Sequence, residues 1–268
     1  LLEKAQSRPS DLKKVIKVAK DEGLLAAYGK AMQRLELPTP IGYSSVGIIE
    51  EVPEDVKDFK KGDIVSCAGS GHSEFILVPI NLCAKVPHDV RLQEASLVTI
   101  ASISLQAIRQ SKAKIGENIA VIGLGLIGQI TMELLEASGC KAIGLDINKK
   151  AIEWSKQNSF SSFNCDSDTL IEDLKAQTEG FGFDSVIITA ATSSNDPIEL
   201  ASEIVRDKGQ ITVLGDARTD LPRKNFYGKE LDLNFSRSYG PGRYDNNYEL
   251  KGIDYPIGYV RWTEKRNM

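Results

Sequence analysis

The sequence has no long apolar run, no strong excess of positive or negative charge, and no segment that resembles a secretory signal peptide. No apolar run reaches the roughly 18–20 residues that a membrane-spanning helix needs, so we expect no membrane partner. The net charge of −4 over 268 residues gives no general attraction to a phosphate backbone, so we expect no nucleic-acid partner. The first ten residues are mostly polar and charged, which predicts a cytoplasmic location.

Residues that bind zinc or form disulfides are also scarce. The chain has two histidines and four cysteines, and no two cysteines form a CxxC pair. They are His72, His88, Cys67, Cys83, Cys140 and Cys165. This spacing argues against a disulfide framework or a zinc knuckle, so we expect reduced thiols and no bound metal.

The length is comfortable for two domains, each with its own core. The chain opens without a methionine and stops without a clear terminal signal, so we expect a piece of a longer protein. Residues 1–37 read as a helical segment, in which Ser10 caps a helix that Gly23 ends. Residues 38–95 predict a small β domain, with strands at 46–52, 63–67 and 73–78 separated by short connectors.

A long apolar helix is expected over residues 92–110, and strands and helices alternate after it. The range 96–240 is assigned to this α/β domain, and 241–268 to an irregular return segment. The expected strands lie at 119–122, 141–146, 162–165, 184–189, 210–214 and 231–236, and the expected helices at 126–137, 149–158, 169–178 and 197–207. Alternation of this kind predicts a doubly wound parallel sheet with helices on both faces.

A glycine-rich turn gives this domain its predicted function. The pattern GxGxxG is formed by Gly123, Leu124, Gly125, Leu126, Ile127 and Gly128. It follows an apolar strand and opens a helix, and Asp146 ends the next strand 18 residues later (146 − 128). Strand, turn, helix and acid together form a dinucleotide-binding fingerprint, whereas the glycines alone would be a weak signal.

Each residue of the fingerprint has a physical role. Gly123 permits the tight turn, Gly125 lets the pyrophosphate approach the backbone, and Gly128 allows the helix to pack on the strand. The free N–H groups of the helix N-terminus favour the phosphates. Asp146 accepts hydrogen bonds from ribose hydroxyls and repels a 2′-phosphate, so we expect NAD rather than NADP.

Two further loops are expected to line the nicotinamide half of the cofactor. They follow the carboxyl ends of later strands, where ligands of open α/β sheets bind. The residues are Thr189, Ala190 and Ala191 in one loop, and Leu214 and Gly215 in the other. Ordinary loop chemistry is the alternative for each of them.

Several motifs resemble one dehydrogenase superfamily. They are the stretch at 40–47 (PIGYSSVG), the stretch at 61–65 (KGDIV) and the GLGLIG turn. With the order of domains, they resemble the medium-chain, zinc-alcohol-dehydrogenase-like superfamily over roughly residues 38–237. The resemblance implies that the small β domain is a partial GroES-like catalytic domain.

Within that superfamily, a bacterial bi-domain subgroup is the most similar. Its dehydrogenase-like half is joined to a glucose-fructose-oxidoreductase-like half, often in sugar or polysaccharide pathways. The stretches 42–45, 239–245 and 259–264 carry this likeness. It implies a covalently linked second oxidoreductase domain that is absent from this chain.

The chain departs from the zinc-binding members at their metal ligands. Those members carry Gly-His-Glu where this chain has Gly42-Tyr43-Ser44, and Thr99 stands about where another ligand, usually cysteine, is found. The resemblance therefore implies a zinc-less member, with Tyr43 and Ser44 facing the nicotinamide and Thr99 beside it. His72, in a glycine-rich loop, is a candidate general acid or base. The alternatives are that Tyr43 and Ser44 pack the cleft floor and that His72 faces solvent.

We therefore expect an NAD(H)-dependent, zinc-independent oxidoreductase. A hydride would pass between nicotinamide and a small alcohol or carbonyl substrate, with sugar derivatives among the candidates. One alternative is a quinone- or enone-reductase-like activity, and another is a non-catalytic NAD-binding module of a larger bi-domain protein. The superfamily often pairs through edge strands, so the strand at 231–236 predicts a homo-oligomer.

Arginines and tyrosines are concentrated after the last expected strand. They are Arg237, Arg243 and Arg261, with Tyr239, Tyr244, Tyr248 and Tyr255. Arginine suits carboxylates and phosphates, and tyrosine stacks on sugar faces. The stretch is interpreted either as a docking surface for a sugar nucleotide or uronic acid, or as an irregular interface with other parts of the protein.

Overall fold

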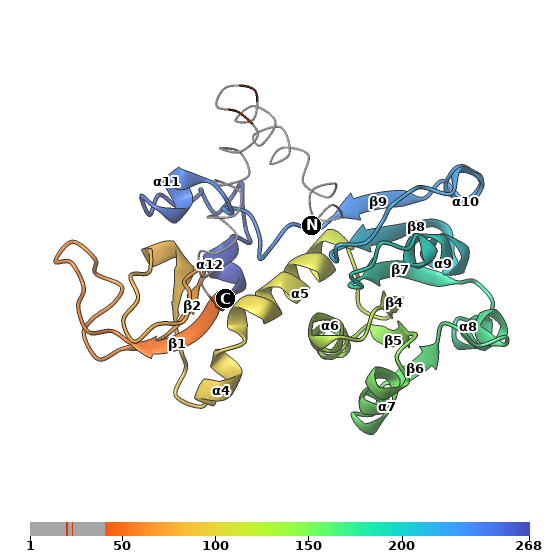
Figure 1. Cartoon of the computed structure of the whole chain (residues 1–268), viewed down its shortest axis with the longest axis horizontal. Helices are drawn as coiled ribbons and strands as arrows, with labels where there is room; N and C mark the ends of the chain where they lie inside the picture. Colours follow the sequence, from red (N-terminus) through yellow and green to blue (C-terminus); the bar gives the residue numbers. More distant parts are fainter. Residues whose placement is uncertain (1–19, 21–22, 24–40) are drawn as a thin grey trace. The chain divides into compact units, whose positions relative to one another are not determined.

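The computed structural model describes residues 20, 23 and 41–268 (Figure 1). The chain divides into two compact units, Leu1–Ile41 and Gly42–Met268. The helical segment expected at residues 1–37 lies outside the described residues, apart from those two positions. The elements described below all belong to the second unit. Within the described part of the chain, no helix is long and apolar enough to cross a membrane.

A six-stranded sheet forms the larger part of this unit. Its strands are β4 (Asn118–Ile122), β5 (Lys141–Asp146), β6 (Ser161–Asn164), β7 (Phe183–Ile188), β8 (Val205–Val213) and β9 (Asp232–Phe235). All neighbouring pairs are parallel, in the order β6-β5-β4-β7-β8-β9. Counted along the chain, that order is 3-2-1-4-5-6, the order of dinucleotide-binding sheets. The predicted Rossmann-type fold is confirmed.

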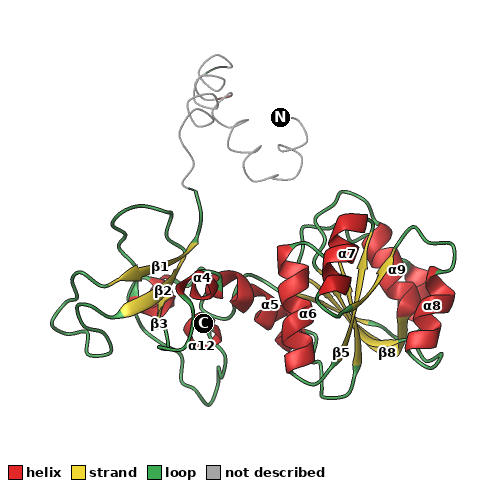
Figure 2. Ribbon diagram, turned by 90° about the horizontal axis from the view of Figure 1, so that it is seen from below, coloured by secondary structure: helices red, strands yellow, loops and turns green. Residues whose placement is uncertain are grey.

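Helices cover both faces of this sheet because its strands are apolar on both sides (Figure 2). On β4, Ile119 and Val121 join one core cluster with α5 (Val98–Gln110), α6 (Leu126–Ala137) and α7 (Lys149–Gln157). Ala120 and Ile122, which point the other way, join a second cluster with α8 (Leu170–Gln177) and α9 (Asp196–Ile204). Alternate residues of one strand thus anchor opposite helical layers.

The smaller sheet is antiparallel and has the order β1-β2-β3. Its strands are β1 (Ser44–Ile48), β2 (Ile64–Ala68) and β3 (Cys83–Lys85), and the short 3-10 helix η1 (Ile80–Leu82) precedes β3. A small antiparallel sheet beside the Rossmann sheet agrees with the prediction. The domain boundaries proposed from the sequence remain predictions.

The strand predicted at 73–78 is wrong. That stretch has no regular structure; Phe75 and Leu77 are 71% and 96% exposed, while Ile76 and Val78 pack against the small core. The apolar run at 75–78 correctly indicated contact with the core, since Ile76 and Val78 are half-buried. It did not show whether a neighbouring strand offers free backbone groups, and β2 already pairs on both sides.

Two expected helices are shorter than the sequence suggested. The helix expected at 92–110 is divided into α4 (Leu92–Ala95) and α5, because Ser96 donates its hydroxyl to the Gln93 carbonyl and Leu97 leaves the helical conformation. The helix expected at 197–207 ends at Ile204, and β8 starts at the next residue.

The return segment has little regular structure and is largely exposed, but a few buried residues anchor it to the rest of the unit. It carries α11 (Asn246–Glu249) and α12 (Glu264–Asn267), after the short α10 (Arg223–Gly228) beside β8 and β9. Asn267 accepts from Arg109 Nε of α5 at 3.0 Å and donates to the Tyr239 carbonyl at 2.9 Å. Asn81 of η1 donates to the Tyr248 carbonyl at 2.9 Å. These bonds tie the segment to both the long helix and the smaller sheet.

Candidate dinucleotide-binding site

The glycine-rich turn joins β4 to α6 at the carboxyl edge of the larger sheet. Gly123 has a φ of +102°, and a Cβ there would lie 2.7 Å from the Ala190 nitrogen. At Gly128 a Cβ would lie 1.9 Å from the Gly123 carbonyl oxygen, so only glycine fits either place. A Cβ on Gly125 would meet no atom within 4 Å, so this residue faces open space. The predicted close approach of a ligand to Gly125 is therefore sterically possible.

Helix α6 begins in that open space without a side-chain cap. The N–H groups of its first turn, which include those of Leu126 and Ile127, have no partner within the helix, so they are available to an anion. Leu124 differs from them because its side chain is buried against Gly144 of β5. Leu124 therefore presents no side chain to this site, and its N–H is donated to Asp146 rather than to a ligand.

Asp146 ends β5 beside the turn. Its Oδ2 accepts from the Leu124 N–H at 2.5 Å and its Oδ1 from the Asn148 N–H at 2.7 Å. A carboxylate has about four acceptor positions, so about two remain for ribose hydroxyls. The structure thus brings the acid to the glycine-rich turn and leaves it acceptor capacity for a ligand.

The two loops expected at the nicotinamide half pack against the same turn. Ala190 donates its N–H to the Ile122 carbonyl at 3.1 Å, and Gly215 donates to the Ile188 carbonyl at 3.0 Å. A Cβ on Gly215 would lie 2.0 Å from the Ala190 carbonyl oxygen. Leu214 lies beside Gly215 and donates to the same Ile188 carbonyl. Ala191 is exposed. The three loops therefore form one continuous edge.

The Thr189 side chain holds the glycine-rich turn through hydrogen bonds that the sequence analysis did not predict. Its hydroxyl lies 2.5 Å from the Gly123 carbonyl oxygen and 3.2 Å from that of Ile122. The proton is donated within the protein, so the hydroxyl positions the turn rather than donating to a ligand. The sequence indicated Thr189 only by its position at the end of β7. It could not show this hydrogen bond, because the two residues lie 66 positions apart.

A substitution tests this positioning role. Thr189→Val should weaken NADH binding roughly tenfold, because the half-buried Gly123 carbonyl loses its donor and the turn loses the hydrogen bond that holds it to β7. Thr189→Ser, which keeps the hydroxyl, should restore most of the affinity. Titration calorimetry of both variants gives the comparison. If the valine variant bound NADH as tightly as the unchanged protein, the hydroxyl would have no part in shaping the turn.

The residues expected at the reaction centre cluster at one end of the smaller sheet. His72 Nε2 lies 3.1 Å from the Ser44 carbonyl oxygen, and its ring covers the place where Gly42 would carry a Cβ. Ser44 donates its hydroxyl to the Ser96 carbonyl at 2.6 Å, so that group already has an acceptor. Tyr43, 47% exposed, accepts a backbone bond from Gly69. Tyr43 and His72 are thus the open polar side chains of this cluster.

Thr99 connects this cluster to the glycine-rich turn through α5. Thr99 is fully buried, and its hydroxyl lies 3.5 Å from the Cys67 carbonyl oxygen at the end of β2. Five residues later, about 7.5 Å along the helix axis, Ser104 donates to the Ile127 carbonyl of α6 at 3.2 Å. One helix therefore fixes the end of β2 relative to the start of α6.

Tyr239 is a further residue at the end of β2. Its ring is buried, and its hydroxyl lies 3.5 Å from the place where Gly69 would carry a Cβ. Burial raises the pKa of Tyr239 to about 12, so the phenol stays protonated at neutral pH. The hydroxyl has no partner among the described residues. The sequence marked this tyrosine only as one of an aromatic group.

The side chains at the positions of the family's zinc ligands do not suit the metal. Zinc takes thiolate, imidazole and carboxylate ligands, whereas a phenol, a hydroxyl bonded to Ser96 and a hydroxyl bonded to Cys67 stand here. No group of three His, Cys, Asp or Glu side chains lies together in the described part of the chain. The prediction of a metal-free centre remains a prediction.

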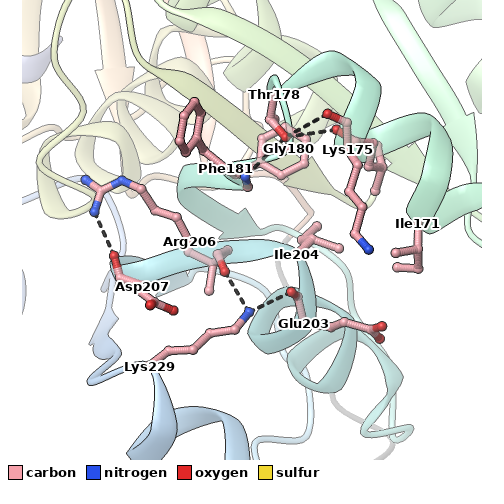
Figure 3. A pocket seen from close by; sticks show the side chains of 14 residues that line it. Ile171, Lys175, Thr178, Gly180, Phe181, Glu203, Ile204, Arg206, Asp207 and Lys229 are labelled. Carbon is pink, nitrogen blue, oxygen red and sulfur yellow. Dashed lines mark hydrogen bonds between the residues drawn. The ribbon is translucent and has the colours of Figure 1, made fainter.

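A separate cavity of 480 Å³ lies at the opposite edge of the larger sheet (Figure 3). It is lined by the starts of β7 and β8, including Phe183 and Val205, so it opens at the amino ends of the strands. Lys229 in its wall donates to the Glu203 and Val205 carbonyls at 2.7 and 2.8 Å, which satisfies the end of α9. Ligands of such sheets bind at the carboxyl ends, so this cavity is not the dinucleotide site.

The sheet order and the glycine-rich turn are those of a dinucleotide-binding fold, and comparisons with known proteins extend this result. Residues 127–251 match the sequence model of the family described as zinc-binding dehydrogenase. D-xylulose reductase A of Aspergillus oryzae is 22% identical over 243 residues, covering 77% of this chain and 68% of the relative. An alcohol dehydrogenase of Geobacillus stearothermophilus is 27% identical over 231 residues, covering 74% and 67%.

The fold is shared with solved dehydrogenases. Galactitol-1-phosphate dehydrogenase from Escherichia coli superposes with a TM-score of 0.68 at 19% identity, over 81% of this chain and 74% of that one. Together the sequence matches make this chain similar to medium-chain zinc-binding dehydrogenases, and the solved structure shows that it shares their fold. They confirm the prediction of an enzyme of the medium-chain dehydrogenase type.

Proposed function

We propose that the chain is the catalytic and cofactor-binding part of an NAD(H)-dependent, zinc-independent dehydrogenase that acts on an alcohol or carbonyl compound, with sugar derivatives as the favoured candidates. The open space at Gly125, between the free start of α6 and Asp146, carries the proposal. The relatives named as alcohol dehydrogenase and D-xylulose reductase support an alcohol-type substrate.

The residues present fit a nicotinamide dinucleotide. The backbone around Gly125 and the first turn of α6 would hold the pyrophosphate, and Asp146 would hold the adenosine ribose. When bound, the nicotinamide supplies the hydride acceptor or donor. A 2′-phosphate would meet the carboxylate of Asp146, so we infer a preference for NAD over NADP.

The proton transfer that accompanies hydride transfer would be carried out by polar side chains near the end of β2. We infer that Tyr43 donates its phenolic proton to the substrate oxygen and that His72 exchanges that proton with solvent. Tyr43 is 47% exposed and His72 is exposed, so both can meet a ligand. Proton donation from Tyr43 would replace the polarisation that zinc provides in other members.

Cofactor choice is tested by titrating NADH and NADPH into the protein before and after Asp146→Ala. We expect NADH to bind at least tenfold tighter than NADPH, because the carboxylate accepts from the ribose and repels the extra phosphate. We expect Asp146→Ala to weaken NADH binding about 10–100-fold, since hydrogen bonds to a charged group are lost. Calorimetry gives both constants directly.

Asp166→Ala is the matched control, since Asp166 is an exposed acid just beyond the end of the neighbouring strand β6. It should leave both constants unchanged. Equal NADH affinity in the Asp146 and Asp166 variants would refute the role of Asp146. Absence of binding by either cofactor to the folded protein would refute the proposed function itself.

A further inference from the structure

The loop that follows β9 runs from the nicotinamide side of the larger sheet to the end of the smaller one. At its start, Ser236 donates its N–H to the Val213 carbonyl, next to the loop of Leu214 and Gly215. Three residues later, Tyr239 reaches the end of β2 at Gly69. Side chains between these points therefore lie where a substrate of the proposed dehydrogenase must approach both sheets.

This loop holds its backbone in an unfavourable conformation. Ser238 and Tyr244 have φ angles of 54° and 69°, in the left-handed region that non-glycine residues rarely adopt. A Cβ on Gly242 would lie 2.5 Å from the ring of Tyr248, so packing imposes the path. Such strain is maintained only where surrounding contacts outweigh its cost, and it concentrates at functional sites.

Two arginines of the loop stack on one exposed ring. The guanidinium carbons of Arg237 and Arg243 each lie 4.1 Å from the ring centroid of Tyr244. Tyr244 follows Arg243 directly in the chain, and Arg237 reaches the same ring from seven residues earlier. Stacking restrains a guanidinium while leaving its N–H edge free to donate.

The two arginines differ in their charge partners. Arg243 donates from Nη1 to Glu249 Oε1 at 2.5 Å, and this carboxylate offsets its charge. Arg237 is exposed, and within residues 41–268 no carboxylate forms an ion pair with it and no acceptor takes its N–H groups. Among the described residues, the guanidinium of Arg237 is thus restrained by stacking, exposed and without a carboxylate partner.

The position of Arg237 assigns it to substrate rather than to cofactor phosphates. It follows β9, which is three strands from β4 and four from β5 in the sheet. At about 4.8 Å per strand, the end of β9 lies roughly 14 Å from the end of β4, where the glycine-rich turn begins, and farther from the end of β5 at Asp146. The pyrophosphate and a 2′-phosphate belong to those two places, so an anion at Arg237 belongs to another molecule.

We propose that Arg237 binds an oxyanion of the substrate, a carboxylate or a phosphate, and that the enzyme therefore acts on an acidic sugar derivative or a similar anionic alcohol or carbonyl compound. The planar fork of Arg237 pairs with two oxygens of the anion, and Tyr244 holds the fork in place. This inference rests on the proposed function, because it places the anion beside the nicotinamide half.

The test is titration calorimetry with three probes, D-glucuronate, D-glucose 6-phosphate and neutral D-glucose, with and without saturating NADH. At least one anionic probe should bind at least about tenfold tighter than glucose, and Arg237→Gln should remove that advantage. The stronger probe identifies the anion as carboxylate or phosphate. Tyr244→Phe should keep the affinity, whereas Tyr244→Leu should weaken it by releasing Arg237.

Arg261→Gln is the matched control, because Arg261 is an exposed arginine stacked on Trp262 at 3.9 Å outside this loop. It should leave anion binding unchanged. Equal binding of all three probes to the unchanged protein, or equal anion binding after Arg237→Gln, would overturn the proposal. NADH affinity is read in the same samples: its retention with no anion preference overturns only this inference, whereas its absence overturns the proposed function.

Discussion

Gly125→Val should abolish NADH binding at concentrations that saturate the unchanged protein, a loss of at least about a hundredfold, without unfolding the chain. A Cβ at this position meets no atom within 4 Å, and the backbone angles of −69° and −171° suit a β-branched residue. The new side chain would fill the space in which a pyrophosphate contacts the backbone and the start of α6. Val caps a helix less well than Gly, which costs about 1 kcal/mol of stability at most.

The matched control is Gly47→Val. Gly47 lies in β1, has no positive φ, and a Cβ added there would also meet open space, so the same substitution should leave both folding and NADH affinity intact. Calorimetric titration and thermal unfolding of the two variants separate binding from stability. Unchanged NADH affinity in Gly125→Val would mean that the pyrophosphate does not bind at this turn.

Gly128→Ala provides the opposite contrast. A Cβ there would lie 1.9 Å from the Gly123 carbonyl oxygen, so even one methyl group forces α6 away from β4. The three glycines of the motif therefore differ: close packing requires glycine at positions 123 and 128, whereas Gly125 faces open space. The sequence analysis expected these separate roles for the three glycines, and the structure adds the distances that distinguish them.

The Rossmann sheet was predictable because its signals are local. The central strands β4, β5 and β7 are short, mainly apolar runs followed at once by a turn or a loop, so they were located nearly to the residue. Parallel strands buried on both faces need such continuous runs. The position of Asp146 at the end of β5 then followed from the same local pattern.

Features that depend on distant partners were not predictable. Asn267 bonds to Gln106 across 161 residues, and the bond of Thr189 to Gly123 crosses from one strand to another. The stretch around Phe75 has a strand-like apolar run but pairs with no strand among the described residues. In each case the hydrogen bonding of a residue depends on which groups the tertiary fold brings close to it. Local sequence patterns do not contain that information.

The buried carboxyl of Glu264 should make the folded protein less stable as pH rises. Glu264 has no exposed surface, and both of its carboxylate oxygens lack a partner among the described residues. Burial, together with the nearby carboxylate of Glu249, raises the pKa of Glu264 to about 8, against the opposing charge of Arg243. Arg243 is bonded to Glu249 instead, so it offsets little of this cost.

The direction of the pH effect depends on whether the folded or the unfolded state binds the Glu264 proton more tightly. The folded state holds the proton of Glu264 up to a pH of about 8, whereas an unfolded chain releases it near 4.5. Its contribution to stability is therefore complete below pH 4.5 and is lost as pH rises from 4.5 through 8. At 1.36 kcal/mol for each unit of pKa difference, the loss is on the order of 5 kcal/mol.

Glu264→Gln should remove this loss, because the amide has nearly the same shape and carries no charge at any pH. The variant and the unchanged protein should have similar free energies of unfolding at pH 5, and the variant should be several kcal/mol more stable at pH 8. Denaturant unfolding followed by tryptophan fluorescence measures the difference, since Trp262 lies two residues from Glu264 and stacks on Arg109 at 3.6 Å.

Glu153→Gln, at an exposed position on α7, should leave the pH dependence unchanged. If Glu264→Gln kept the pH slope of the unchanged protein, the carboxyl would be ionised within the fold, and the return segment would have to supply it with partners that its buried surroundings lack.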